Sequence, residues 1–100
     1  MILEKASLIV KLGQEEQFEK DFKVASQYIS AVKGYISHSL HLCLEKKNKY
    51  LLLVQWETLQ DHTTGFRESD QYLQWKSLLH HYYHPFPIVE HYVEKYKNKQ

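Results

Sequence analysis

The sequence of 100 residues contains seven histidines, a side chain used for proton transfer and metal binding near neutral pH. His80 and His84 have the spacing of two metal ligands on one face of a helix, but Pro85 disfavours a helical backbone at His84. On a strand, His38 and His41 would point to opposite faces and could not bind one metal ion. Because no carboxylate or thiolate completes a ligand set near them, we expect no metal site.

The sequence has no motif for nucleophilic or nucleotide-dependent chemistry. Cys43 lies near Lys46 and Lys47 but has no neighbouring base, so we expect a packed thiol rather than a nucleophile. There is no glycine-rich phosphate loop and no G-x-S-x-G sequence. One cysteine cannot form an internal disulfide, and no basic-then-apolar leader follows Met1, so we expect a cytoplasmic protein.

Residues 56–69 and the helix predicted after them are the most informative part of the sequence. They contain His62 within an aromatic set that comprises Trp56, Phe66, Tyr72 and Trp75. If a short helix covers the end of the sheet, these side chains could converge on one pocket that holds a titratable imidazole. The alternative is an aromatic core that contains a hydrogen-bonded histidine, and the residue types alone favour it.

Hydrophobic periodicity predicts the elements that must position these residues. Alternating apolar and polar residues predict four strands, at residues 2–12, 35–45, 50–57 and 88–96. Helical spacing after Gln14 predicts a helix that ends near Gly34, with one apolar stripe made of Phe18, Phe22, Ala25, Ile29 and Val32. Residues 46–49 form a polar turn between the second and third strands.

Two helical pieces are predicted between the third and fourth strands. Thr58 is suited to cap a short helix that runs to about Phe66. Ser69 is suited to cap a second helix that ends before Pro85 and on which Tyr72, Trp75, Leu79 and Tyr82 keep helical spacing.

The order β-α-β-β-α-β predicts a single α+β domain over residues 1–100, a ferredoxin-like sandwich with an antiparallel sheet and both helices on one face. The strand at residues 50–57 is apolar on both faces over most of its length. Helices can cover only one of these faces, and a monomer would leave a large apolar patch exposed. We therefore expect a homodimer that packs sheet against sheet.

The charge balance excludes several classes of partner. The chain has 13 Lys and Arg against 12 Asp and Glu, a net charge of +1, which provides no strong field for nucleic acid or an anionic membrane. The longest aliphatic run, residues 51–54, is far shorter than a membrane span. The third strand also lacks the glycine and spaced aromatic residues of an RNA recognition module.

Several stretches, in this order and at this length, resemble the antibiotic biosynthesis monooxygenase family. The resemblance covers nearly the whole chain and rests on residues 10–13 (Val-Lys-Leu-Gly), Gly34-Tyr35, residues 53–57 (Leu-Val-Gln-Trp-Glu), His62-x-x-Gly65-Phe66-Arg67-x-Ser69 and residues 85–92. It implies a ferredoxin-like dimeric α/β barrel with a pocket in each subunit between the sheet and the helices.

The characterised members of that family differ in their chemistry. Some oxidise polycyclic phenols or quinols with O₂ and without flavin, metal or haem, whereas others degrade haem or rearrange small phosphorylated molecules. Trp56 matches a strand-end Trp of the phenol-oxidising relatives, but Leu52 stands where they have Asn and His62 where they have Tyr. Haem-degrading relatives need an Asn on the first strand and a His on the later helix, which residues 5–7 and the helix around Trp75 do not supply.

We therefore expect a cofactor-independent monooxygenase that oxidises a small aromatic, phenolic or quinol substrate with O₂. In this hypothesis His62 removes a proton, Trp56 holds the ring by stacking, and Arg67 stabilises the resulting anion. Further substrate contacts are expected from Phe66, Tyr72, Trp75, Leu52 and His38. The alternative is a non-catalytic dimeric module that binds an aromatic or haem-like small molecule.

Overall fold

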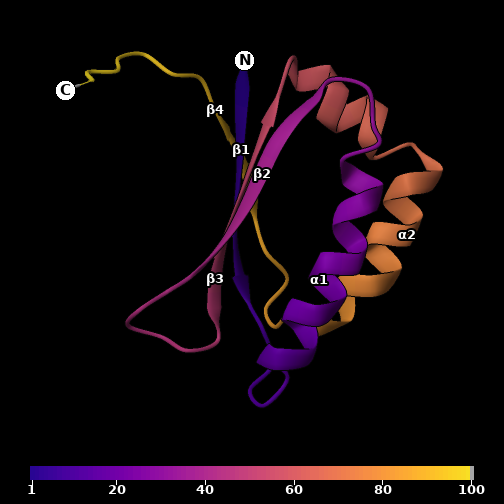
Figure 1. The fold of residues 1–100 in the computed structure, drawn as a ribbon, viewed down its shortest axis with the longest axis vertical. Helices are drawn as coiled ribbons and strands as arrows, with labels where there is room; N and C mark the ends of the chain where they lie inside the picture. The colour runs from indigo at the N-terminus through magenta and orange to yellow at the C-terminus, as the bar shows by residue number, and fades with distance from the viewer. Residues whose placement is uncertain (100) are drawn as a thin grey trace.

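Two layers make up the fold in a computed structural model, which describes residues 1–99 (Figure 1). The elements are β1 (Ile2–Ile9), α1 (Glu15–Ile29), β2 (Tyr35–Leu42), β3 (Lys49–Trp56), the π-helix η1 (Asp61–Phe66), α2 (Asp70–Leu79), the 3₁₀-helix η2 (His80–Tyr82) and β4 (Val89–Tyr92). The strands pair antiparallel in the order β2-β3-β1-β4, and both α-helices cover one face. The predicted α+β, ferredoxin-like fold is confirmed.

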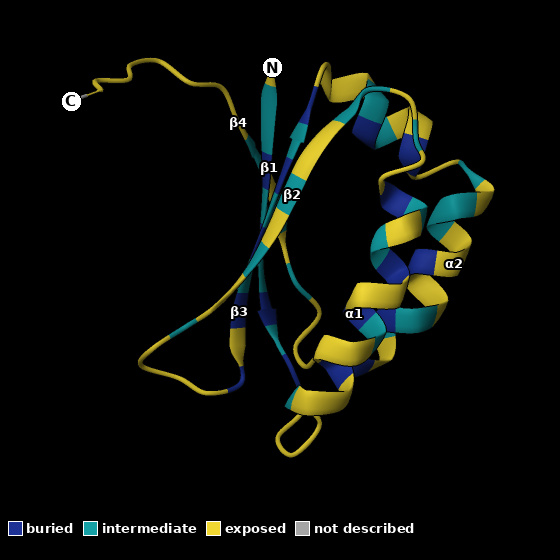
Figure 2. Cartoon of the chain, viewed as in Figure 1, coloured by how far each residue is buried: buried dark blue, intermediate teal, exposed yellow. Residues whose placement is uncertain are grey.

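The core lies between the sheet and the two helices, where Figure 2 shows the buried residues. The predicted stripe of α1 is confirmed for Phe18, Phe22, Ala25 and Ile29, all of which are buried. Val32 follows the end of the helix and is only partly buried against the core. On the sheet, alternate residues of β1 and β3 point into the same core: Ala6, Leu8, Tyr50, Leu52, Val54 and Trp56.

The predicted last strand extends too far, since β4 ends at Tyr92 rather than at residue 96. Strand β4 pairs only with β1, and its last pair is Tyr92 with Leu3. Since β1 begins at Ile2, the chain beyond Tyr92 soon has no neighbouring strand with which to form hydrogen bonds. In Figure 1 this final segment leaves the body of the molecule.

Strand β2 also departs from strict alternation. A bulge between Tyr35 and Ser37 changes the register, and the Tyr35 hydroxyl hydrogen-bonds to Nδ1 of His38. Leu42 and Leu44 are exposed, because the hairpin turns away from the helices there (Figure 1).

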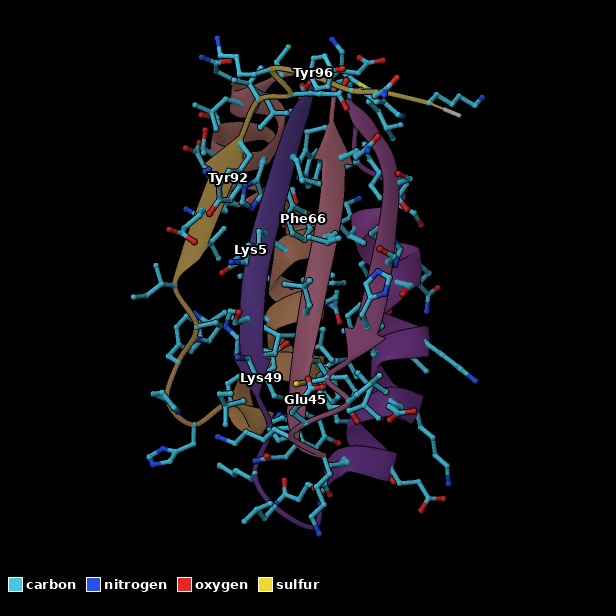
Figure 3. All side chains as sticks on the ribbon, turned by 90° about the vertical axis from the view of Figure 1, so that its left-hand side faces the viewer. Lys5, Glu45, Lys49, Phe66, Tyr92 and Tyr96 are labelled. Atoms are coloured by element: carbon cyan, nitrogen blue, oxygen red, sulfur yellow. The ribbon has the colours of Figure 1, made fainter. Side chains whose placement is uncertain are left out.

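The outer face of the sheet is open in the single chain (Figure 3). Its residues on β3, Leu51 and Leu53, are half-buried in the single chain. Lys5 of β1 lies on the same face and approaches Glu90 of β4 at 4.0 Å. A second copy of the chain that covers this face remains a prediction. Within residues 1–99, the structure has no helix with both the length and the apolar surface needed to span a membrane.

Candidate active site

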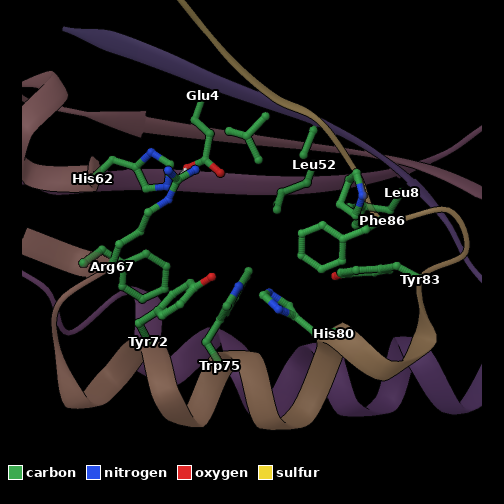
Figure 4. Close-up of a pocket in the computed structure, with 14 residues that line it drawn as sticks. Glu4, Leu8, Leu52, His62, Arg67, Tyr72, Trp75, His80, Tyr83 and Phe86 are labelled. Carbon is green, nitrogen blue, oxygen red and sulfur yellow. Dashed lines mark ion pairs between the residues drawn. The ribbon is translucent and has the colours of Figure 1, made fainter. Parts of the chain in front are cut away.

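A cavity of about 350 Å³ lies between the sheet and α2 (Figure 4). Ala6, Leu8 and Leu52 form its wall on the sheet, and Tyr72 and Trp75 of α2 face them across the space. Phe66 adds a further aromatic ring. The two ends differ in chemistry: one is formed by Glu4, His62 and Arg67, and the other by His80, Tyr83 and Phe86 (Figure 4).

The start of η1 is fixed where β2 begins and β3 ends. The Thr58 hydroxyl accepts a hydrogen bond from the Asp61 amide, and the Asp61 carboxylate accepts one from the Thr58 amide, which together cap the helix start. Gly34 lies directly beneath, with a φ of +87°, and a side chain there would clash with the Asp61 carboxylate. The Glu57 amide donates to the Gly34 carbonyl at 2.8 Å. These contacts set the position from which His62 enters the site.

Ser69 sets the start of α2, as predicted. Its side chain accepts a hydrogen bond from the Tyr72 amide at 3.2 Å and donates to the Phe66 carbonyl at 2.6 Å. The same side chain thus joins the end of η1 to the beginning of α2. As a result the rings of Phe66, Tyr72 and Trp75 meet, with Phe66 5.2 Å from Tyr72 and 5.9 Å from Trp75, both edge to face.

The polar end of the cavity is a connected set of side chains from four elements. Nε1 of Trp56 donates a hydrogen bond to Oε1 of Glu4 at 2.9 Å. Nε2 of His62 lies 3.3 Å from the same oxygen (Figure 4). Nδ1 of His62 lies 2.8 Å from Nε2 of His91. His91 in turn lies opposite Glu4 in the pairing of β4 with β1. The rings of Trp56 and His62 also stack, with centroids 5.3 Å apart.

Burial controls the electrostatics of this set. The Glu4 side chain is almost inaccessible, and burial raises its pKa, while the Trp56 hydrogen bond and the charge of Arg67 act in the opposite direction. Burial, together with the smaller effects of Arg67 and His91, lowers the pKa of His62 to about 3. His62 is therefore a neutral imidazole near pH 7 with both nitrogens already in contact with protein groups.

The other end of the cavity contains a second histidine. Burial, followed by the charge of Lys76, lowers the pKa of His80 to about 4. Its ring lies 4.9 Å from that of Phe86, edge to face, and 5.9 Å from that of Tyr72. Burial also raises the pKa of the Tyr83 phenol, so it stays protonated. This end is aromatic and uncharged near neutral pH.

The structure brings most of the predicted site residues together. The cavity is lined by six of them: His62, Arg67, Phe66, Tyr72, Trp75 and Leu52. Trp56 is fully buried behind this surface and contacts the site through its hydrogen bond to Glu4 and its stacking on His62. His38 lies elsewhere, where its Nε2 is 2.9 Å from the hydroxyl of Ser26 and its Nδ1 meets Tyr35. Its side chain ties β2 to α1 and does not line the cavity.

The sequence interpretation missed Glu4, His91, His80 and Tyr83. Of these, only Glu4 had a usable signal, since it is a charged residue at the position on β1 that alternation with Ala6 and Leu8 assigns to the core. Across residues 1–99, no three His, Cys, Asp or Glu side chains are placed so that they could hold a metal ion. The site chemistry is that of a carboxylate, neutral imidazoles, a guanidinium and aromatic rings.

Comparisons with known proteins agree on one family. The model of a family described as antibiotic biosynthesis monooxygenase matches residues 1–78. The uncharacterised protein YczJ of Bacillus subtilis is 56% identical over 94 residues, which cover 94% of this chain and 99% of that protein. A crystal structure of a candidate antibiotic biosynthesis monooxygenase from Bordetella bronchiseptica is 30% identical, with a TM-score of 0.90 over 95% of this chain and 97% of that one. SnoaB of Streptomyces nogalater, described as a cofactor-independent oxygenase, is 18% identical with a TM-score of 0.69 over 98% and 94% of the two chains, and it shares the fold.

Proposed function

The chain belongs to the antibiotic biosynthesis monooxygenase family, and we propose that it is a cofactor-independent monooxygenase that oxidises a small phenol or quinol with O₂. The observation that carries the proposal is the cavity of about 350 Å³, which has aromatic walls and ionisable groups concentrated at one end. The likeness to SnoaB, a cofactor-independent oxygenase, supports the reaction class.

The two ends of the cavity suit the two parts of such a substrate. Tyr72, Trp75 and Phe66 offer ring edges and faces against which a flat aromatic molecule can pack. At the polar end a substrate hydroxyl would meet the carboxylate of Glu4 and the guanidinium of Arg67. Removing its proton gives an electron-rich anion, the form of a phenol or quinol that reacts with O₂, and Arg67 would stabilise the charge.

Oxygen uptake tests the proposal. The purified protein is supplied with anthrone or with a small quinol, and O₂ consumption is followed together with the absorbance of the quinone product. The variant Ala6→Leu adds carbon atoms to the sheet wall of the cavity, so we expect kcat/KM to fall at least about tenfold. Ala31→Leu makes the same chemical change in the exposed turn after α1 and should keep the native rate.

The proposal is refuted if no substrate of this class supports O₂ uptake above the protein-free rate, or if Ala6→Leu keeps native activity. A second function is favoured by one feature, the apolar side chain of Leu52, which gives the sheet wall no hydrogen-bond donor. Such a cavity could bind an aromatic molecule without transforming it. Saturable binding of anthrone, measured by quenching of tryptophan fluorescence, with no turnover would support that function instead.

A further inference from the structure

The two oxygens of the Glu4 carboxylate have different surroundings. Oε1 accepts the hydrogen bond from Trp56 and lies 3.3 Å from Nε2 of His62. Oε2 makes no hydrogen bond to any of the described residues, 1–99, although Glu4 lines the cavity. In Figure 4 the carboxylate lies between His62 and the open space of the cavity. One oxygen is therefore held by the protein, and the other is available to a molecule in the cavity.

The chemistry of the partners determines which atom donates each proton. An indole N–H can only donate, so Oε1 is the acceptor from Trp56. Because this oxygen accepts, the contact with neutral His62 is favourable when Nε2 carries the ring proton. Nδ1 of His62 is then an acceptor, and its partner at 2.8 Å, Nε2 of His91, must be the donor. Trp56 and His62 thus direct their protons toward one carboxylate oxygen, and His91 directs its proton toward His62.

We propose that Glu4 is the general base of the oxidation, with Oε2 as the atom that accepts the substrate proton, and that His62 and His91 are positioning residues. This inference rests on the proposed function. It assigns the proton transfer to a group other than His62, which the sequence had suggested as the base. Protonation at Oε2 leaves the contacts of Oε1 with Trp56 and His62 in place, so the site needs no rearrangement during the reaction.

The step balances with O₂ as the only co-substrate. The substrate O–H bond breaks, its electron pair stays on the substrate, and the proton bonds to Oε2 of Glu4. The anion forms a carbon–oxygen bond with O₂, and Glu4 returns the proton to the terminal oxygen of the resulting organic peroxide. The O–O bond then breaks as the same carbon loses its hydrogen. One oxygen atom remains in the product as a carbonyl, and the other leaves as water.

The groups that face Glu4 favour this assignment. Trp56 comes from β3, His91 from β4, and His62 and Arg67 from η1 and its C-terminal end. Among them Arg67 is the cation, and its charge keeps the carboxylate available in the ionised form. Burial makes this carboxylate a stronger base than an exposed one, whereas the same burial weakens His62 as a base.

Glu4→Gln tests the role of the base, because glutamine keeps the shape and an oxygen that can accept from Trp56 but cannot take a substrate proton. We expect kcat for O₂ uptake to fall by about 10² to 10⁴-fold, with little change in the dissociation constant of the substrate. Glu68→Gln, at an exposed position near Arg67, is the matched control and should keep native kcat. Native kcat in Glu4→Gln would overturn the proposal.

A second measurement does not depend on oxidation. The phenolate of 4-nitrophenol absorbs in the visible, so its ionisation in the bound state can be read directly at a pH below its own pKa. We expect bound phenolate with the native protein and mainly the neutral phenol with Glu4→Gln. Equal phenolate in both would overturn the role of Glu4. If no substrate gives turnover, the proposed function fails, and this measurement still decides whether Glu4 is a base.

The positioning role is tested by ¹⁵N NMR of the histidine rings, first in the native protein and then in two variants. In the native protein we expect His62 as the neutral tautomer with its proton on Nε2. His91→Phe removes the donor to Nδ1 and should give a mixture of tautomers and a lower kcat, while His91→Gln restores an N–H donor and should recover both. A native His62 with its proton on Nδ1, or a lower kcat in His91→Phe with the tautomer unchanged, would overturn this part.

Discussion

The pKa of His62 makes a quantitative prediction about stability at acid pH. Its folded-state pKa is about 3, against an ordinary value of 6.5 that applies to the unfolded chain. On acidification the unfolded state therefore binds this proton first, so stability is lost as the pH falls below 6.5, and the loss ends near the folded-state pKa. Between about pH 7 and about pH 5 this one residue lowers the free energy of unfolding by about 2 kcal/mol.

Urea denaturation of the native protein and of His62→Gln isolates this contribution. Trp56 and Trp75 are both buried, so their fluorescence reports unfolding. Other groups near the cavity titrate in both proteins, so their effects are common to the two pH dependences. Glu4, for example, makes the folded state more stable on acidification, because its pKa is raised and its protonation favours the folded state. The native protein should thus lose about 2 kcal/mol more than His62→Gln over this pH range at equal protein concentration.

The control is His81→Gln, which changes an exposed histidine on η2 and should keep the pH dependence of the native protein. If the native protein and His62→Gln lose the same stability between the two pH values, His62 takes up its proton as readily in the folded state as in the unfolded chain. The reasoning that burial keeps this imidazole neutral would then be wrong, and so would the direction assigned to its hydrogen bonds.

Two further predictions concern the elements around the site. In urea denaturation, Gly34→Ala should lower the free energy of unfolding by over about 1 kcal/mol more than Gly13→Ala does. Both glycines have a positive φ, but only a Cβ at position 34 would meet Asp61. Equal losses in the two variants would contradict this reasoning. Leu53→Glu on the outer face of β3 should convert the predicted sheet-to-sheet homodimer into a folded monomer, as measured by light scattering. Leu73→Glu, on the exposed surface of α2, should leave the protein dimeric. A native protein that is monomeric at all concentrations would refute the dimer.

The elements of this fold were predictable because each depends on neighbours in sequence. The stripe on α1, the two hairpin strands and the caps at Thr58 and Ser69 all follow from local spacing. The end of β4 and the bulge in β2 did not, since they depend on which strand lies alongside. Where β1 begins decides where β4 must stop, and no periodicity within residues 88–96 contains that information.

The aromatic wall of the site was also predictable, whereas its polar end was only partly so. Tyr72 and Trp75 are one helical turn apart, and their common direction follows from spacing alone. Glu4, His62 and His91 come from the two ends and the middle of the chain. They meet because the register of β1 with β4 places Glu4 opposite His91 and because η1 crosses the same end of the sheet. Sequence spacing cannot supply a contact between residues so far apart.

The number of buried charges favours Glu4 over His62 as the base. If neutral His62 took the substrate proton, the buried cavity would acquire both an imidazolium and a substrate anion. When Glu4 takes it, a carboxylate becomes neutral as the substrate becomes charged, so the number of charged groups beside Arg67 stays the same. Stability alone would favour an apolar residue next to Ala6 and Leu8, because burial penalises the ionised carboxylate. The proposed proton transfer provides a reason for a charged residue on the buried face of β1.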